Sequence, residues 1–147
     1  MTFKDAAGRE WLVRIDVNAL RRVRDGTGMN FGDWTEIGSL LKRMHFDDLF
    51  VAEVAYLVVK PEIDSRKIDE SGFYAELYGD AIARAADAIQ QGIVGFFRHP
   101  AIRAGVKAEI AATKELTQSL LTKGYGSEST KSPEGSESTP APSPLAS

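Results

Sequence analysis

The stretch that decides the fold reads Leu49-Phe-Val-Ala-Glu-Val-Ala-Tyr-Leu-Val-Val59, and its one charged residue is Glu53. Its valines are β-branched, so a buried strand is one interpretation of the run. The run is long for a strand, however, and it contains two alanines and a glutamate, which favour a helix. Because apolar side chains lie almost all around this helix, we expect it to form the centre of a helical bundle.

Polar residues and a proline mark the expected limits of this central helix. Asp47 or Asp48 can serve as the N-cap by accepting hydrogen bonds from the first free backbone amides. Lys60-Pro61 should end the helix, because the residue before a proline resists the α conformation. A polar loop is then expected through Asp69.

The N-terminal residues predict a β-hairpin. Apolar and polar residues alternate on both sides of the turn Asp5-Ala-Ala-Gly8, in which Gly8 can take a positive φ. The alternating apolar residues are Phe3, Trp11, Val13 and Ile15. Asp16 follows as the N-cap of a helix from about 17 to 26, which Gly26 and Gly28 should end.

Helical periodicity continues on either side of the central run. Before it, one apolar stripe is formed by Trp34, Ile37, Leu40, Leu41 and Met44. After it, Asp69 can cap a short helix that bears Phe73, Leu77 and Tyr78. Gly79-Asp80 is then a break and a new cap for a helix from Ala81 to Phe97, whose apolar face consists of Ile82, Ala85, Ala86, Ile89, Ile93, Phe96 and Phe97.

The last predicted helix, from about 101 to 122, carries the candidate binding residues. Its apolar seam is narrow and is flanked by charged residues; it consists of Ile102, Val106, Ile110, Thr113, Thr117 and Leu120. So narrow a stripe suits an exposed or partner-seeking helix better than a core helix. We therefore predict protein-binding roles for Ile102, Val106 and Ile110 and for the preceding junction, Phe96 and Phe97. The apolar face around Trp34 and Ile37 is the next candidate.

Composition separates a folded domain, residues 1–125, from a tail, residues 126–147. The tail contains four of the six prolines and one large apolar residue, Leu145, so it cannot bury enough surface to offset the entropy of ordering it. The expected fold class is α+β and mostly α: an N-terminal β-hairpin, then a helical bundle, then a disordered Ser/Pro/Glu-rich tail.

Charge and composition argue against several partners and compartments. A net charge of −3 gives no overall attraction to nucleic acid or anionic membranes, and acidic neighbours dilute the one basic cluster, Arg21, Arg22 and Arg24. The longest uninterrupted apolar run, Val54 to Val59, is too short to span a membrane, and the N-terminus lacks the pattern of a signal peptide. The absence of cysteine fits a reducing cytoplasm.

No motif in the sequence predicts catalysis. His45 and His99 each stand alone, without the paired spacing of a metal site. The glycines of Gly26-Thr-Gly-Met-Asn-Phe-Gly32 follow a helix rather than a strand, so they indicate a turn and not a dinucleotide loop. The carboxylate pairs Asp47-Asp48 and Asp69-Glu70 fit helix capping. We expect a non-enzymatic binding protein with no catalytic, cofactor or metal site.

Several short motifs, taken in order, resemble the tail assembly chaperones of long-tailed bacteriophages and prophages. The chain begins with the form Phe-x-Asp-x-x-Gly-Arg-x-Trp, and the later steps include Thr27-Gly28 and Phe96-Phe97 before Pro100. The remaining matches are Ile15-Asp-Val17, Arg22-Val-Arg24, Val59-Lys-Pro61, Leu77-Tyr-Gly-Asp-Ala81 and Ser-Thr-Pro-Ala-Pro142. The chain is similar to the small members of that family, in which a β-hairpin precedes helices.

This resemblance implies a function and a set of partners. Such a chaperone coats the long helical tape measure protein in the host cytoplasm before the tail tube polymerises, and it is absent from the mature virion. The tail of this chain would match the shorter of two products made by a ribosomal frameshift. Further candidate partners are the longer frameshifted form and the tail-tube protein, and an oligomer is compatible with the sequence. The alternative is a small adaptor or structural subunit of a phage-like particle.

Overall fold

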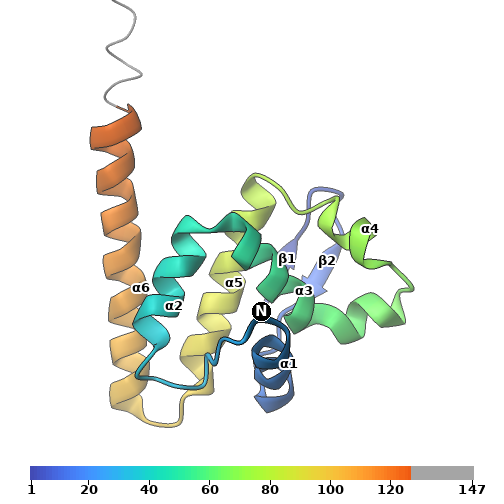
Figure 1. Ribbon diagram of the computed structural model, residues 1–147, viewed down its shortest axis with the longest axis horizontal. Coiled ribbons are helices and arrows are strands. Elements are labelled where there is room, and N and C mark those ends of the chain that lie inside the picture. Colours follow the sequence, from blue (N-terminus) through green and yellow to red (C-terminus); the bar gives the residue numbers. More distant parts are fainter. Residues whose placement is uncertain (127–147) are drawn as a thin grey trace, which may run out of the picture. The chain divides into compact units, whose positions relative to one another are not determined.

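The computed structural model describes residues 1–126, with side chains through residue 123. A compact unit spans Met1–Ala111, and a second unit begins at Ala112, within the last helix. The tail predicted for residues 126–147 lies, apart from Gly126, outside the described residues. The elements are β1 (Thr2–Lys4), β2 (Glu10–Leu12), α1 (Val17–Thr27), α2 (Ile37–Phe46), α3 (Asp48–Ser65), α4 (Glu70–Tyr74), α5 (Asp80–Phe96), α6 (Pro100–Leu120) and a π-helical turn, η1 (Leu121–Gly126) (Figure 1).

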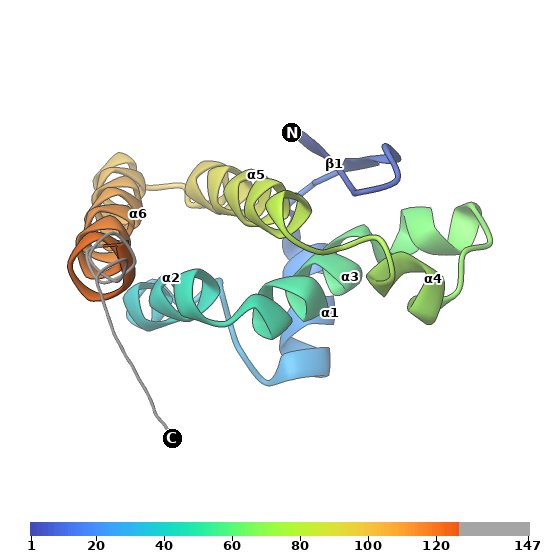
Figure 2. The ribbon, with the colours of Figure 1, turned by 90° about the horizontal axis from the view of Figure 1, so that it is seen from above.

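The predicted hairpin is confirmed, and both of its edges are bonded to helices. β1 and β2 are antiparallel with Phe3 opposite Trp11, and Gly8 has a φ of 85° in the turn. At the outer edge of β2, the Leu12 amide donates to the Glu62 carboxylate of α3 (3.0 Å). At the outer edge of β1, the Arg84 guanidinium of α5 donates to the Lys4 carbonyl (3.0 Å), and Figure 2 shows α5 beside β1. Helical side chains therefore bond to both edges of this short sheet.

Helix α3 is the centre of the bundle, as predicted. It contacts α1, α2, α4, α5 and β2, and it buries side chains on several faces. The buried residues of α3 are Phe50, Val51, Val54, Ala55, Val58, Val59 and Ile63. Asp47 is its N-cap, and its carboxylate accepts from the Phe50 amide (3.0 Å).

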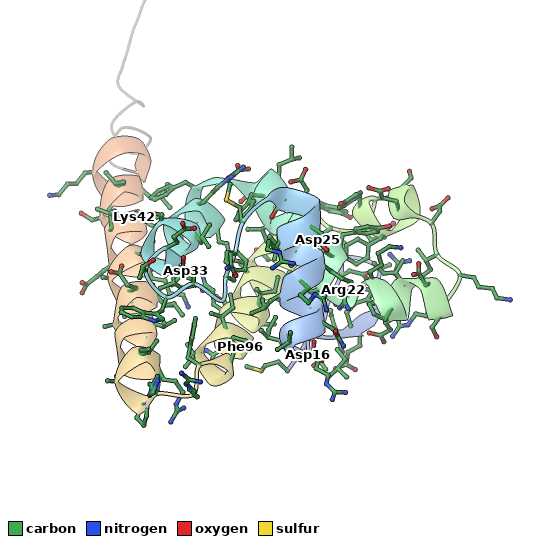
Figure 3. The ribbon with its side chains drawn as sticks, turned by 60° about the horizontal axis from the view of Figure 1, so that its bottom comes forward. Asp16, Arg22, Asp25, Asp33, Lys42 and Phe96 are labelled. Atoms are coloured by element: carbon green, nitrogen blue, oxygen red, sulfur yellow. The ribbon has the colours of Figure 1, made fainter. Side chains whose placement is uncertain are left out.

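The predicted end of this helix at Lys60-Pro61 is wrong, because α3 continues through Pro61 to Ser65. Proline has no N–H, so the carbonyl of Leu57, four residues earlier, lacks its helical donor. Arg22 of α1 replaces that donor: its Nε donates to the Leu57 carbonyl (2.7 Å) and its Nη2 to the Val58 carbonyl (2.9 Å). Figure 3 shows Arg22 in the middle of α1, between Asp16 and Asp25. A contact between two helices thus allows a proline inside α3.

The stripe predicted for the second helix needs one correction, at Trp34. Helix α2 begins at Ile37, and its buried residues are Ile37, Leu40, Leu41 and Met44. Trp34 lies before the helix, in a turn where the Asp33 carboxylate accepts from the Thr35 amide (3.0 Å) and hydroxyl (2.6 Å). This turn places the indole outside the buried stripe, and 57% of the residue's surface is exposed.

Two glycines also differ from their predicted roles. Helix α1 has the predicted N-cap, Asp16, but it ends at Gly28, which has a φ of 77°, so Gly26 lies inside the helix. A Cβ at Gly26 would lie 2.7 Å from Cδ1 of Leu57, so this glycine permits close packing of α1 on α3. At α5 the N-cap is Gly79, with a φ of 57°, and Asp80 is the first helical residue rather than the cap.

Candidate protein-binding surface

The N-terminal motif that carries the family resemblance forms a structural cluster around Asp5. The carboxylate of Asp5 is buried and accepts four hydrogen bonds: from the amides of Ala7 (3.1 Å) and Arg9 (2.9 Å), from Arg9 Nε (2.7 Å) and from Trp11 Nε1 (3.0 Å). Burial alone would raise the pKa of Asp5, but the hydrogen bonds from Trp11 and Arg9 hold that pKa below its ordinary value. The side chains of Asp5, Arg9 and Trp11 are thus bonded to one another within the fold.

The same cluster fastens the hairpin to the region around α4. Arg9 Nη2 donates to the Gly72 carbonyl (3.2 Å), and the Ala6 amide donates to the Glu76 carbonyl (2.8 Å). The Trp11 indole meets the ring of Phe73 edge-on, with centroids 5.3 Å apart. We assign this motif to stability rather than to recognition.

Other candidates from the sequence also have structural roles. Asp69 caps α4 by accepting from the Gly72 amide (2.7 Å), as predicted. In the basic cluster, Arg22 is bonded to α3, and Arg24 lies 3.4 Å from the carboxylate of Asp25. His45 lies 3.5 Å from the amide of Gln90, which is buried.

The predicted binding residues differ in their exposure. Val106 is 2% exposed and Phe97 is 6% exposed, so the core of this chain already covers both side chains. Phe96, Ile102 and Ile110 are half-buried and pack against the core. Little of Val106 and Phe97 is therefore exposed to a partner, and their binding role stays a prediction. A narrow apolar stripe has the same sequence pattern whether a partner covers it or a neighbouring part of the same chain does.

The structure brings the predicted junction at Phe96 and the alternative face around Trp34 together in one groove. The groove consists of two adjoining hollows, of about 450 and 350 Å³, which share Trp34 and Ile102. The larger hollow is also lined by Thr35, Ile37, Gly38, Ala101, Gly105, Val106 and Glu109. The smaller hollow is also lined by Gly32, Phe96, Phe97, Arg98 and His99. We call this surface the Trp34 groove.

Local interactions hold the walls of the Trp34 groove. The rings of Phe96 and Phe97 meet edge-on, with centroids 5.6 Å apart, and Figure 3 labels Phe96 at the end of α5. Arg103 Nη1 donates to the carbonyls of Phe97 (2.7 Å) and Arg98 (3.1 Å), which stabilises the turn between α5 and α6. The exposed indole therefore lies beside a defined turn rather than an unsupported loop.

Small residues line part of the groove. Gly38 and Gly105 line the larger hollow, together with Ala101. A Cβ at Gly105 would meet no heavy atom within 4 Å, so no close contact inside the chain requires a glycine there. Glycine inside a helix costs roughly 1 kcal/mol relative to alanine. The open space above Gly105 lets another backbone approach α6 closely.

Within residues 1–126, no three His, Asp or Glu side chains gather in a way that could hold a metal ion. None of the described helices has the length and apolar character needed to cross a membrane. Comparisons of the chain with protein-family models, with curated proteins and with solved structures gave no match.

Proposed function

We propose that this chain is a non-enzymatic assembly chaperone for phage or prophage tails, which binds and solubilises the tape measure protein in the host cytoplasm. The observation that carries the proposal is the exposed indole of Trp34 over an apolar groove. Tryptophan is strongly enriched among the residues that dominate the free energy of protein–protein binding. An exposed tryptophan in an apolar, concave setting supports this groove as the place where a protein partner binds.

The partner in this proposal follows from the sequence motifs. A tape measure protein is long, helical and apolar, and it must be kept from aggregating before the tail tube forms around it. An apolar groove can bind one face of an amphipathic helix through anchors spaced three and four residues apart. The half-buried side chains of Phe96 and Ile102 beside the indole give the groove more than one apolar contact.

Co-expression tests this function directly. The chain is expressed together with a phage tape measure protein, and the soluble fraction of the tape measure protein is measured by quantitative immunoblot. We expect wild type to keep the partner soluble and Trp34→Ala to leave most of it in the pellet. Losing an anchor tryptophan costs on the order of 2 kcal/mol or more, which is roughly a thirtyfold loss of affinity.

Tyr78→Ala is the matched control, because Tyr78 is also an exposed aromatic residue (61%) but does not line the Trp34 groove. This variant should solubilise the tape measure protein as well as wild type does. Circular dichroism and thermal unfolding check that both variants are folded. The proposal fails if wild type leaves the tape measure protein insoluble.

A further inference from the structure

We infer that the Trp34 groove binds an amphipathic helix whose apolar face is followed by an acidic turn, and that this acidic turn lies on Arg98. The inference rests on the proposed function and adds the chemistry of the segment that is bound. It follows from three properties of the groove: its length, the open space at Gly105 and the charge of the end that Arg98 lines.

The length of the groove fits a short helical segment. Its lining extends along α6 from Ala101 to Glu109. At 1.5 Å per residue these positions span roughly 12 Å, which is a little more than two turns of a helix. Apolar side chains at positions i, i+3 or i+4, and i+7 of a partner helix cover that distance. Trp34 and Ile102 line this hollow, and Phe96 lines the adjoining one.

The open space at Gly105 and the bonded sheet favour a helix over an extended strand. A Cβ at Gly105 would meet nothing within 4 Å, so the backbone of a partner helix can approach α6 closely there, whereas the Glu109 carboxylate lies over Gly38. An added strand would need an open sheet edge, but both outer edges of the hairpin carry hydrogen bonds to α3 or α5, and no hairpin residue lines the groove.

The charged residues of the groove differ between its two ends. Beside Phe96 and Phe97, Arg98 and His99 line the smaller hollow, and Arg98 Nε lies 3.1 Å from His99 Nε2. Arg103, which lines neither hollow, supports this end by donating to the carbonyls of Phe97 and Arg98. The far end of the larger hollow carries the carboxylate of Glu109. The end that Arg98 lines is thus complementary to carboxylates.

The test uses three synthetic helical peptides with an identical leucine face and a different final turn: Glu-Glu, Gln-Gln or Lys-Lys. Binding is followed by tryptophan fluorescence, because Trp34 is exposed whereas Trp11 is fully buried and gives a constant background. A Trp34→Phe variant confirms that any change comes from Trp34. We expect a blue shift on binding and an affinity order of Glu over Gln over Lys.

The expected preference is modest, because each exposed ion pair contributes only a fraction of the affinity. The Glu peptide should bind roughly two- to tenfold more tightly than the Gln peptide in low salt, and the difference should shrink in 1 M NaCl. Arg98→Glu should reverse the order of the Glu and Lys peptides. Arg14→Glu is the matched control, because Arg14 is exposed and does not line the groove, so the order should stay unchanged.

The other outcomes overturn the inference. Equal affinity for the three peptides, or an order of affinities that Arg98→Glu leaves unchanged, would show that the groove does not recognise an acidic turn. A blue shift of Trp34 that appears with rising protein concentration alone, with a dimer in sedimentation, would assign the groove to a second copy of this chain. In both cases the proposed function stands if co-expression still solubilises the tape measure protein, so the two failures are distinguishable.

Discussion

The bond between Arg22 and the proline-containing helix gives a prediction that can be worked out quantitatively. Arg22→Leu removes the donors to the Leu57 and Val58 carbonyls, at 2.7 and 2.9 Å, while it keeps much of the apolar contact of the side chain. A hydrogen bond from a charged donor is worth about 1.5–3 kcal/mol. Because Arg22 is half exposed and water can partly replace it, we expect a total loss of about 1–2 kcal/mol in the free energy of unfolding.

A double-mutant cycle with Pro61→Ala isolates the physical cause. Alanine at this position restores a backbone N–H that can donate to the Leu57 carbonyl, so the carbonyl no longer depends on Arg22. In the Pro61→Ala background, Arg22→Leu should therefore lower the free energy of unfolding by about 1 kcal/mol less than it does in the wild-type background. Arg24→Leu is the control: Arg24 lies on the same helix but pairs with Asp25 on the surface, so its loss should stay within about 0.5 kcal/mol.

Urea unfolding, followed by circular dichroism and by tryptophan fluorescence, measures the four corners of the cycle. Coincident transitions by the two probes and a constant dependence on urea are needed for the free energies to be compared. The reasoning is refuted if Arg22→Leu costs the same in the wild-type background and in the Pro61→Ala background. It is also refuted if Arg22→Leu is as mild as Arg24→Leu.

Two further perturbations test the packing of α5 and the hairpin. Gly92→Ala should destabilise the fold by about 1–3 kcal/mol in thermal unfolding, because the added Cβ would overlap the branched side chain of Ile15. A Cβ at Gly95 would meet nothing within 4 Å, so Gly95→Ala should be neutral or stabilising by up to about 1 kcal/mol. The lowered pKa of Asp5 means that its carboxylate stabilises the folded state above its ordinary pKa of 3.8, and that this stability is lost as the pH falls through the lowered pKa. At pH 7 the free energy of unfolding of wild type should exceed that of Asp5→Asn by on the order of 3 kcal/mol. Urea titrations should show this difference closing below pH 4. A difference that does not change with pH would show that the carboxylate charge is irrelevant.

Local signals predicted much of the fold. The side-chain caps Asp16, Asp47 and Asp69 each bond an amide three positions on, and the hairpin around Gly8 pairs residues no more than ten positions apart; all are confirmed. The apolar run of α3 also identified the central helix, although it did not show that Leu57, in the middle of the run, is only half-buried.

The errors arose where tertiary contacts decide the outcome. The continuation of α3 through Pro61 depends on Arg22, almost forty positions earlier, and no local pattern records that bond. The turn at Asp33 removed Trp34 from a stripe whose spacing it otherwise matched. In the candidate binding surface, the sequence identified apolar residues at the correct elements, but it could not show that the core covers Val106 whereas Trp34 is exposed.

The helical bonds at the two edges of the hairpin have a consequence for the order of events during synthesis. Residues 1–12 leave the ribosome before Glu62 and Arg84, which bond to the strand edges and are made 50 and 80 positions after their partners. A two-stranded hairpin alone is marginally stable in water. The hairpin should therefore become protected from proteases late, only after α5 has been translated.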